Sequence, residues 1–408
     1  MTDIIKVPEL LCPAGDMDCL RAAVSFGADA VYLAGEEFGM RTASDNFSAD
    51  GLKQAVDFAH KNGVKVHITC NVLPHNDEFA RLPLFLETVA SSGADAVIAS
   101  DLGTMQLVKK YVPNAELHAS VQSGIVNYAT AEFLYNMGAK RVVLARELSL
   151  EEIAEIRAKT PKEMEIETFI HGAMCVSYSA RCLLSDYMTG RDANRGDCAQ
   201  SCRWSYSLVE QKRPGELYDI TETDRGTYIL NSNDLCMAEH LDKVANAGVD
   251  CIKIEGRAKS EYYVAVTANA YRGALDELKA NPETFVVPAW VRDELTKISH
   301  REYSTGFYFG KPHNSQTYPT AGYVREYAVA AVVDSYEDGF IICTMKNRFS
   351  VGDELDCLEA GNKPFTFKAA KIIDEKGESV DVANHPMMKY KIEFNRPIKK
   401  GSMLRIKI

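Results

Sequence analysis

Cysteine is the residue type that most sets this sequence apart, because four of its eleven cysteines fall between residues 174 and 204. They are Cys175, Cys182, Cys198 and Cys202, at intervals of seven, sixteen and four residues, and Cys236 follows thirty-four residues later. Polar residues and glycines surround them. Most of the other cysteines stand in apolar, strand-like runs, where a thiol packs as a small hydrophobic side chain.

Three kinds of site are compatible with this cluster of thiols. A structural zinc site normally shows paired CxxC-like knuckles, and here only the four-residue interval is of that kind. A cysteine nucleophile needs a base, which His171 could be for Cys175, but one nucleophile leaves the other thiols unexplained. An iron–sulfur cluster needs four thiolates that converge from loops. The residues favour an iron–sulfur cluster, and a zinc site or a cysteine nucleophile remains open as an alternative.

The helices and strands that must position these cysteines follow a repeated pattern along the first 260 residues. In each repeat a glycine ends a helix, a short β-branched apolar run follows, and small or polar residues come last. This order is typical of strands that are buried on both faces of a parallel sheet. Five strands of this kind are predicted, at residues 26–35, 62–71, 92–101, 137–146 and 247–256. Three further strands fit the series, at residues 8–15, 115–120 and 165–172, which makes eight.

Eight strands that alternate with helices predict an α/β fold, a TIM-type (β/α)8 barrel, over residues 1–315. A doubly wound open sheet is the runner-up, but the first strand is not followed by the GxGxxG that would favour it. The seventh strand precedes an insertion at about 173–240 that carries the cysteines. Residues 316–323 are a predicted linker, and short alternating strands in 324–408 predict a small C-terminal all-β barrel domain.

Polar residues follow almost every predicted strand, at the barrel face that carries the active sites of such folds. Each could simply cap a helix, but arginines at several strand ends suit bidentate pairing with carboxylates or phosphates. We therefore expect a pocket for a charged small molecule, a carboxylate or a phosphate. The candidates for substrate binding are Arg41, Asn71, His118, Gln122 and Arg146, and those for catalysis are His171, Glu255 and Arg257.

Composition and charge limit the function classes. The sequence begins without the basic and apolar regions of a signal peptide, and it lacks an apolar run long enough to span a membrane, so we expect a cytoplasmic protein. An odd number of cysteines in such a chain argues against a disulfide framework. The net charge of −11 argues against a protein that coats nucleic acid generally, but residues 389–408 carry seven basic side chains and one acidic one.

The stretch ETFIHGAMCVSYSARCLLS, residues 167–185, resembles the signature of peptidase family U32. The residues that fill the signature positions are Glu167, Phe169, Gly172, Ala173, Met174, Cys175, Cys182 and Ser185, with Ala180 where glycine is commoner. The stretches ELLCPAGD, GADAVYLAG, CNVLPHNDE, NSNDLC and IKIEGR also resemble the family. The resemblance thus spans essentially the whole chain, including its C-terminal domain.

The resemblance implies a cofactor and a reaction. Some branches of the family hydroxylate RNA or ubiquinone precursors and carry a [4Fe–4S] cluster on four cysteines. Carried over by spacing, the ligands are Cys175, Cys182, Cys198 and Cys236, with Cys202 as the alternate. The branch that this chain resembles most forms 5-hydroxyuridine at the wobble position of tRNA, with prephenate as the implied hydroxyl source or required metabolite.

The same resemblance implies partners. A tRNA must be held by phosphate contacts, some of which residues 389–408 could supply, and a target uracil could stack on Tyr178, Tyr187 or Trp204 unless these pack in the core. An oligomer, or a partner subunit of the same family, is also possible. The alternatives are a cysteine- or metal-dependent collagenase-like peptidase, although HExxH and GxSxG are missing, and a non-enzymatic RNA-binding scaffold.

Overall fold

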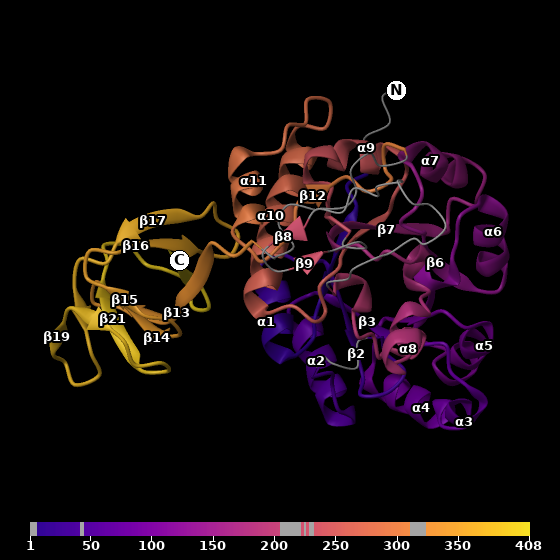
Figure 1. Ribbon diagram of the computed structural model, residues 1–408, viewed down its shortest axis with the longest axis horizontal. Coiled ribbons are helices and arrows are strands. Elements are labelled where there is room, and N and C mark those ends of the chain that lie inside the picture. The colour runs from indigo at the N-terminus through magenta and orange to yellow at the C-terminus, as the bar shows by residue number, and fades with distance from the viewer. Residues whose placement is uncertain (1–5, 41–44, 205–221, 224–225, 228–231, 311–323) are drawn as a thin grey trace.

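The computed structural model describes residues 6–40, 45–204, 222–223, 226–227, 232–310 and 324–408. It forms a parallel barrel surrounded by helices, with a second, all-β domain beside it (Figure 1). The predicted linker at 316–323 and Arg41 lie outside the described residues.

Eight parallel strands form the barrel, and it is closed because the last of them, β11, pairs with both β1 and β7. The predicted TIM-type fold is thereby confirmed. The strands are β1 (Glu9–Pro13), β2 (Ala30–Ala34), β3 (Lys65–Cys70), β4 (Ala96–Ala99), β5 (Glu116–Ala119), β6 (Ala139–Val143), β7 (Glu165–Ala173) and β11 (Cys251–Ile254).

Helices with side-chain caps connect these strands. Asp16, Ser48 and Asp101 each accept a backbone N–H of the first turn, and Ser149 forms a capping box with Glu152. The helices are α1 (Met17–Ser25), α2 (Ala49–Lys61), α3 (Asn76–Phe79), α4 (Leu82–Ser92), α5 (Leu102–Tyr111), η1 (Val121–Ser123), α6 (Tyr128–Asn136), α7 (Leu150–Ala158), η5 (Ala238–His240), α9 (Leu241–Asn246), α10 (Glu261–Ala280) and α11 (Ala289–Thr296). Within the described ranges, none of the helices is both long and apolar enough to cross a bilayer.

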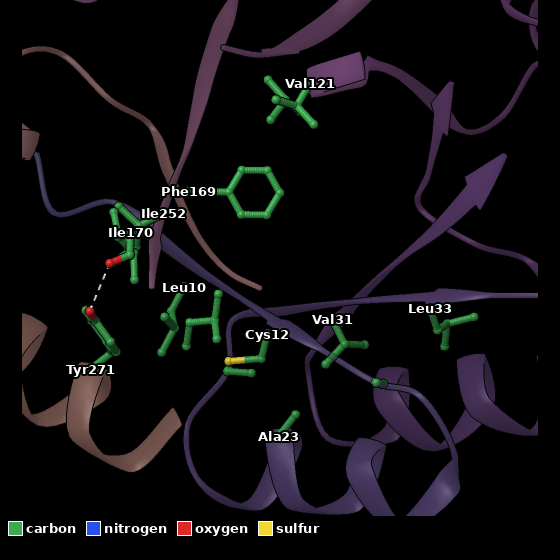
Figure 2. Close-up of a cluster of buried hydrophobic side chains, with 14 of the residues drawn as sticks. Leu10, Cys12, Ala23, Val31, Leu33, Val121, Phe169, Ile170, Ile252 and Tyr271 are labelled. Atoms are coloured by element: carbon green, nitrogen blue, oxygen red, sulfur yellow. Dashed lines mark hydrogen bonds between the residues drawn. The ribbon is translucent and has the colours of Figure 1, made fainter. Parts of the chain in front are cut away.

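The main core fills the space between the barrel and its helices. Leu10, Cys12 and Val31 lie against Ala23 of α1, and the hydroxyl of Tyr271 on α10 donates a hydrogen bond of 3.1 Å to the backbone carbonyl of Ile170 (Figure 2). Cys12 is fully buried, and burial raises its thiol pKa well above the ordinary value. It acts as a core side chain, as the apolar run around it predicts.

The insertion after β7 is partly anchored to the barrel wall. The last residues of β7 pair antiparallel with β10 (Asp234–Cys236), and β10 pairs with β12 (Tyr303–Ser304). Between β7 and β10 the described elements are η2 (Tyr178–Ala180), α8 (Leu184–Thr189), η3 (Ala193–Arg195), η4 (Ser201–Arg203), β8 (Glu222–Thr223) and β9 (Gly226–Thr227).

The C-terminal domain is an eight-stranded antiparallel sheet curled into a half-barrel, next to a two-stranded sheet of β15 and β20. It lies beside α10 and α11, on the opposite side of the barrel from α4, α5 and α6 (Figure 1). Its strands are β13 (Tyr327–Glu337), β14 (Phe340–Met345), β15 (Phe349–Ser350), β16 (Glu354–Leu358), β17 (Phe365–Lys368), β18 (Ile372–Ile373), β19 (Ser379–Val380), β20 (Val382–Ala383), β21 (Lys389–Glu393) and β22 (Met403–Lys407).

A buried cluster of charges joins the two domains. The guanidinium of Arg405 on β22 is fully buried and donates to Glu294 of α11 at 2.7 and 2.9 Å and to Asp356 of β16 at 2.6 Å. Lys297 contacts the same two carboxylates. The expectation that residues 389–408 supply phosphate contacts therefore does not hold for Arg405, although Lys391 of the same segment is exposed.

Candidate functional site

A pocket opens at the C-terminal ends of the barrel strands, where the fold was expected to carry its site. Five of the predicted residues line it, namely Asn71, Gln122, Arg146, Glu255 and Arg257. They come from the ends of β3, β5, β6 and β11, so the barrel brings together residues that are up to 186 positions apart in the sequence.

Three cationic side chains give this pocket a positive character. Arg146 and Arg257 are almost fully buried. The ammonium of Lys253 on β11 lies 4.4 Å from the ring centroid of Tyr32 and 5.3 Å from that of Phe169. Glu255 is the acidic side chain of the lining. Buried cations that face a cavity are suited to hold a carboxylate or phosphate.

Neighbouring groups hold Arg146 and Arg257 in place. Arg146 stacks 4.3 Å above the Phe169 ring and donates from Nη1 to the Ala173 carbonyl at 2.9 Å. Arg257 donates from Nη1 to the hydroxyl of Thr69 at 2.8 Å. Among the described residues, the buried Nε of Arg146 and Nε2 of Gln122 have no hydrogen-bond partner. Such unused donors in a pocket indicate a ligand or water.

A fully buried carboxylate lies beneath the pocket. Glu167 of β7 accepts from Lys253 Nζ at 2.9 Å and from Arg141 Nη1 at 3.3 Å. Burial alone would raise the pKa of Glu167, but the positive charges of Lys253 and Arg141 outweigh it and lower that pKa to about 2. Arg141 also contacts Glu9 and Glu165 at 2.8 and 2.6 Å. Lys253 thus reaches the pocket with its charge held by a fixed partner.

His171, a candidate for catalysis, is not at the pocket. The strand β7 carries a bulge where Phe169 and His171 pair with consecutive residues of β11, so the alternation of inward and outward side chains shifts. The imidazole is consequently directed at Tyr271, whose hydroxyl lies 3.3 Å from Nδ1, and at Tyr263 and Tyr303. Burial lowers the pKa of His171 to about 3. These contacts do not support a Cys175–His171 catalytic pair.

His118, a candidate for substrate binding, lies within β5 rather than after it. Its ring is fully buried, packs edge-on against His67 at 4.8 Å, and approaches Glu116 at 3.1 Å. Burial and the nearby charges of Arg141 and Lys253 keep the pKa of His118 well below its ordinary value. It is a neutral core residue below the pocket.

Backbone amides are directed at the sulfurs of four cysteines. The N–H groups of Ser177, Leu184 and Gln200 lie 3.4, 3.3 and 3.4 Å from the sulfurs of Cys175, Cys182 and Cys198, in each case from two residues further along the chain. The N–H of Ala238 does the same for Cys236. Such hydrogen bonds stabilise thiolates and tune the sulfur ligands of clusters.

Cys202 and Cys236 occupy different surroundings. Burial raises the pKa of Cys202, and the negative charge of the thiolates of Cys175, Cys198 and Cys182 raises it further, so Cys202 lies near enough to these three thiols to feel their charge. The sulfur of Cys236, in contrast, lies 3.8 Å from the hydroxyl of Tyr271, at the base of the insertion. Cys202 thus resembles a fourth ligand in its position near Cys175, Cys182 and Cys198. Cys236 instead resembles these three in the amide hydrogen bond that its sulfur accepts.

The cysteine segment, residues 174–204, is anchored around the mouth of the pocket. Arg181 Nε donates to the Gln122 carbonyl at 2.6 Å, and Ser179 donates to Glu147 at 2.7 and 2.8 Å. On another side, Asn194 accepts the N–H of Leu73 at 3.1 Å and Arg195 pairs with Glu78 at 2.8 Å. The segment thus contacts the loops after β3, β5 and β6, which surround the pocket.

The signature residues at 167–172 each have a structural role at this site. Glu167 neutralises Lys253, and the ring of Phe169 contacts both Lys253 and Arg146. Gly172 has a φ of +105°, and a Cβ there would lie 2.3 Å from the Glu255 carbonyl. Only glycine therefore allows β7 to approach the end of β11 so closely.

Sequence reasoning missed Lys253, Tyr32 and Thr69 as pocket residues. The signal for Lys253 was present, because a lysine inside the apolar run CIKI cannot be buried without a partner. That partner, Glu167, is 86 residues away and becomes evident only when β7 and β11 pair.

Known proteins match this sequence along almost its whole length. The sequence profile "Peptidase family U32" matches residues 15–318, and the profile of the family's C-terminal domain matches residues 325–405. The chain is 36% identical over 405 residues to tRNA hydroxylation protein P1 of Bacillus subtilis, covering 98% of this chain and 95% of the relative. It is also 36% identical to tRNA hydroxylation protein P of Escherichia coli, covering 92% and 91%.

A further relative has a different named product. The 23S rRNA 5-hydroxycytidine C2501 synthase of Escherichia coli is 39% identical over 270 residues, which cover 66% of this chain and 39% of that protein.

Replacing Glu167 by Gln tests the buried charge network. We expect the free energy of unfolding at neutral pH to fall by about 3–5 kcal/mol, because Lys253 and Arg141 lose a buried counter-charge. The depressed pKa means that the wild type loses this stability as the pH falls from about 4.5 to about 2, and the variant should lack that part of the pH dependence.

Urea unfolding at a series of pH values measures both effects. The matched control is Glu155→Gln, whose carboxylate pairs with Lys159 at the surface and should change stability by less than about 1 kcal/mol. A Glu167→Gln protein as stable as this control would contradict the role assigned to the network.

Proposed function

This chain is a member of peptidase family U32, and we propose that it hydroxylates RNA, converting the wobble uridine of tRNA to 5-hydroxyuridine. We further propose prephenate as its small-molecule co-substrate and a [4Fe–4S] cluster as its cofactor. Two relatives of nearly full length are named for tRNA hydroxylation, and a third for forming 5-hydroxycytidine in rRNA. Hydroxylation of RNA is the activity that these names share, and the third name specifies a pyrimidine product.

The proposal rests mainly on the cationic pocket. This pocket occurs in a chain that matches a tRNA hydroxylation protein along almost its whole length. Prephenate carries two carboxylates, and Arg146, Lys253 and Arg257 offer more than one cation to bind them. Gln122 and Asn71 add neutral polar groups that can orient a ligand or a base edge. Replacing the C5–H bond of uracil by C5–OH is a two-electron oxidation, so a co-substrate or cofactor must take part.

The cysteines suit an iron–sulfur cluster in type and in hydrogen bonding. Thiolates are the ligands that iron–sulfur clusters use, and the amides directed at Cys175, Cys182, Cys198 and Cys236 are the support that such ligands need. Among the described residues, no three His, Cys, Asp or Glu side chains lie close enough to hold a metal ion. The proposal therefore requires the thiols to draw together when the cluster binds. A bound cluster would supply electron transfer or Lewis acidity.

We assign the four ligands to Cys175, Cys182, Cys198 and Cys236, because each accepts an amide hydrogen bond from two residues further on. Cys202 lies near the first three and is the alternate. A peptidase mechanism has less support, because the imidazole of His171 is turned toward tyrosines. An oligomer or a partner subunit remains a prediction.

The cluster assignment predicts the iron content of single variants. Purified without oxygen, the Cys175→Ala, Cys182→Ala, Cys198→Ala and Cys236→Ala proteins should lose most of their iron and sulfide, because each lacks a ligand. Cys202→Ala should keep them, as should the control Cys343→Ala, which removes a buried thiol of the C-terminal domain. Elemental analysis and absorption spectra measure the effect.

Two outcomes would contradict this assignment. Zinc in place of iron in the wild type would exclude the cluster. Iron that is lost from Cys202→Ala and kept in Cys236→Ala would make Cys202 the fourth ligand.

The activity itself is tested by nucleoside analysis of tRNA. A strain that lacks this chain should lose 5-hydroxyuridine, and the wild-type gene should restore it, whereas Cys198→Ala should not. Cys343→Ala serves again as the control and should restore the modification. Normal 5-hydroxyuridine in a strain that lacks this chain and any second member of its family would contradict the proposed function.

A further inference from the structure

Large apolar side chains are exposed on the cysteine segment far more often than elsewhere. Of the sixteen exposed large hydrophobic side chains among the described residues, six lie within residues 176–204. Their exposed fractions reach 80% for Tyr187, 54% for Tyr178 and 42% for Trp204. Core packing, the other expectation for these three aromatics, is therefore excluded. The remaining members of this exposed apolar patch are Val176, Leu183 and Met188.

Hydrogen bonds fix the elements that carry the patch to one another and to the barrel. Tyr187 and Met188 are on α8, and Ser185 of the same helix accepts the N–H of Ala199 at 2.9 Å. That bond ties α8 to the chain that leads into η4 and Trp204. Tyr178 is on η2, which Ser179 and Arg181 fasten to Glu147 and to the Gln122 carbonyl at the pocket mouth.

We propose that the exposed patch on residues 176–204 binds the single-stranded nucleotides on either side of the target base, by stacking them on Tyr178, Tyr187 and Trp204. This inference rests on the proposed function, because it supplies the docking surface for that RNA substrate. Arg181, directly after η2 and Tyr178, is bonded to the carbonyl of Gln122, which lines the pocket, so a base in the pocket has its neighbouring nucleotides close to this side of the patch.

The composition of the patch favours a loop of RNA over a duplex or a protein. Aromatic faces accept any unstacked base, whereas paired bases in a duplex do not expose theirs. Four arginines and three aspartates are interspersed in residues 174–204, so the segment has only a small positive charge. We therefore expect stacking to contribute more than phosphate contacts, and the salt dependence of binding by this surface to be weak.

The fluorescence of Trp204 gives a direct test. The chain has two tryptophans, and Trp290 packs against Gly273 of α10, away from the patch. In a Trp290→Phe protein that retains its cofactor, a tRNA anticodon stem–loop should quench the emission of Trp204, because a stacked base quenches indole. The same RNA with its loop bases paired to a complementary strand should quench it far less.

Variants measure the contribution to affinity. Tyr187→Ala and Trp204→Ala should each weaken binding of the fluorescein-labelled stem–loop at least about 5-fold, and the double variant about 25-fold or more. Phe133→Ala is the matched control, because Phe133 is an exposed aromatic on α6. The iron content of each variant shows that the neighbouring cysteines are undisturbed.

The outcomes separate this inference from the proposed function. Variants that bind the stem–loop as tightly as wild type, while wild type hydroxylates tRNA, would overturn the inference alone. A changed oligomeric state with unchanged RNA affinity would also overturn it and identify the patch as a protein interface. A wild-type protein that neither binds nor hydroxylates RNA would overturn both.

Discussion

The contact between Glu167 and Lys253 is the interaction on which the site depends. An ammonium inside a barrel core is tolerated only with a fixed counter-charge, and Glu167 provides it at 2.9 Å. Arg141 then compensates the carboxylate from the other side and extends the network to Glu9 and Glu165. Because this network joins β1, β6, β7 and β11, it fixes the strands that bring Arg146, Glu255 and Arg257 into one pocket.

The cysteine segment depends on the same frame. It leaves the barrel directly after β7, and its contacts at Gln122, Glu147 and Glu78 attach it to three loops of the barrel mouth. The thiols of this segment are partly buried, whereas its aromatic side chains Tyr178, Tyr187 and Trp204 are exposed. The proposed cluster and the exposed patch thus both depend on β7 and on the segment after it, which is attached at the mouth of the pocket.

Much of the fold was predictable because each barrel strand is an apolar run, and in five of the eight a glycine that ends the preceding helix comes before it. The candidate site was less predictable from the sequence than the fold. Asn71, Gln122, Arg146, Glu255 and Arg257 were found because strand ends converge in a barrel, whereas His118 and His171 were misplaced. For His171 the cause is the bulge in β7, which reverses the side-chain alternation after Phe169 and which the sequence does not mark.

The other features that the sequence did not reveal depend on contacts between residues far apart in the chain. The burial of Arg405 depends on Glu294 and Asp356, which are 111 and 49 residues away, so a strip of basic residues could not be separated into exposed and buried members beforehand. The choice between Cys202 and Cys236 likewise depends on where each sulfur points, which intervals between cysteines do not determine. The proposed reaction rests on the family resemblance, and the structure adds a pocket whose cationic lining suits a carboxylate.

Calorimetric titration of prephenate into the purified protein with its cofactor tests the central claim most directly. Arg257→Met is the variant to compare, with Lys65→Met, at the opposite end of the barrel, as its control. We predict binding by the wild type and by Lys65→Met, and binding about 10-fold weaker or more in Arg257→Met, because a charged hydrogen-bond donor is lost. Wild-type protein that does not bind prephenate, or Arg257→Met protein that binds it equally well, would contradict the account.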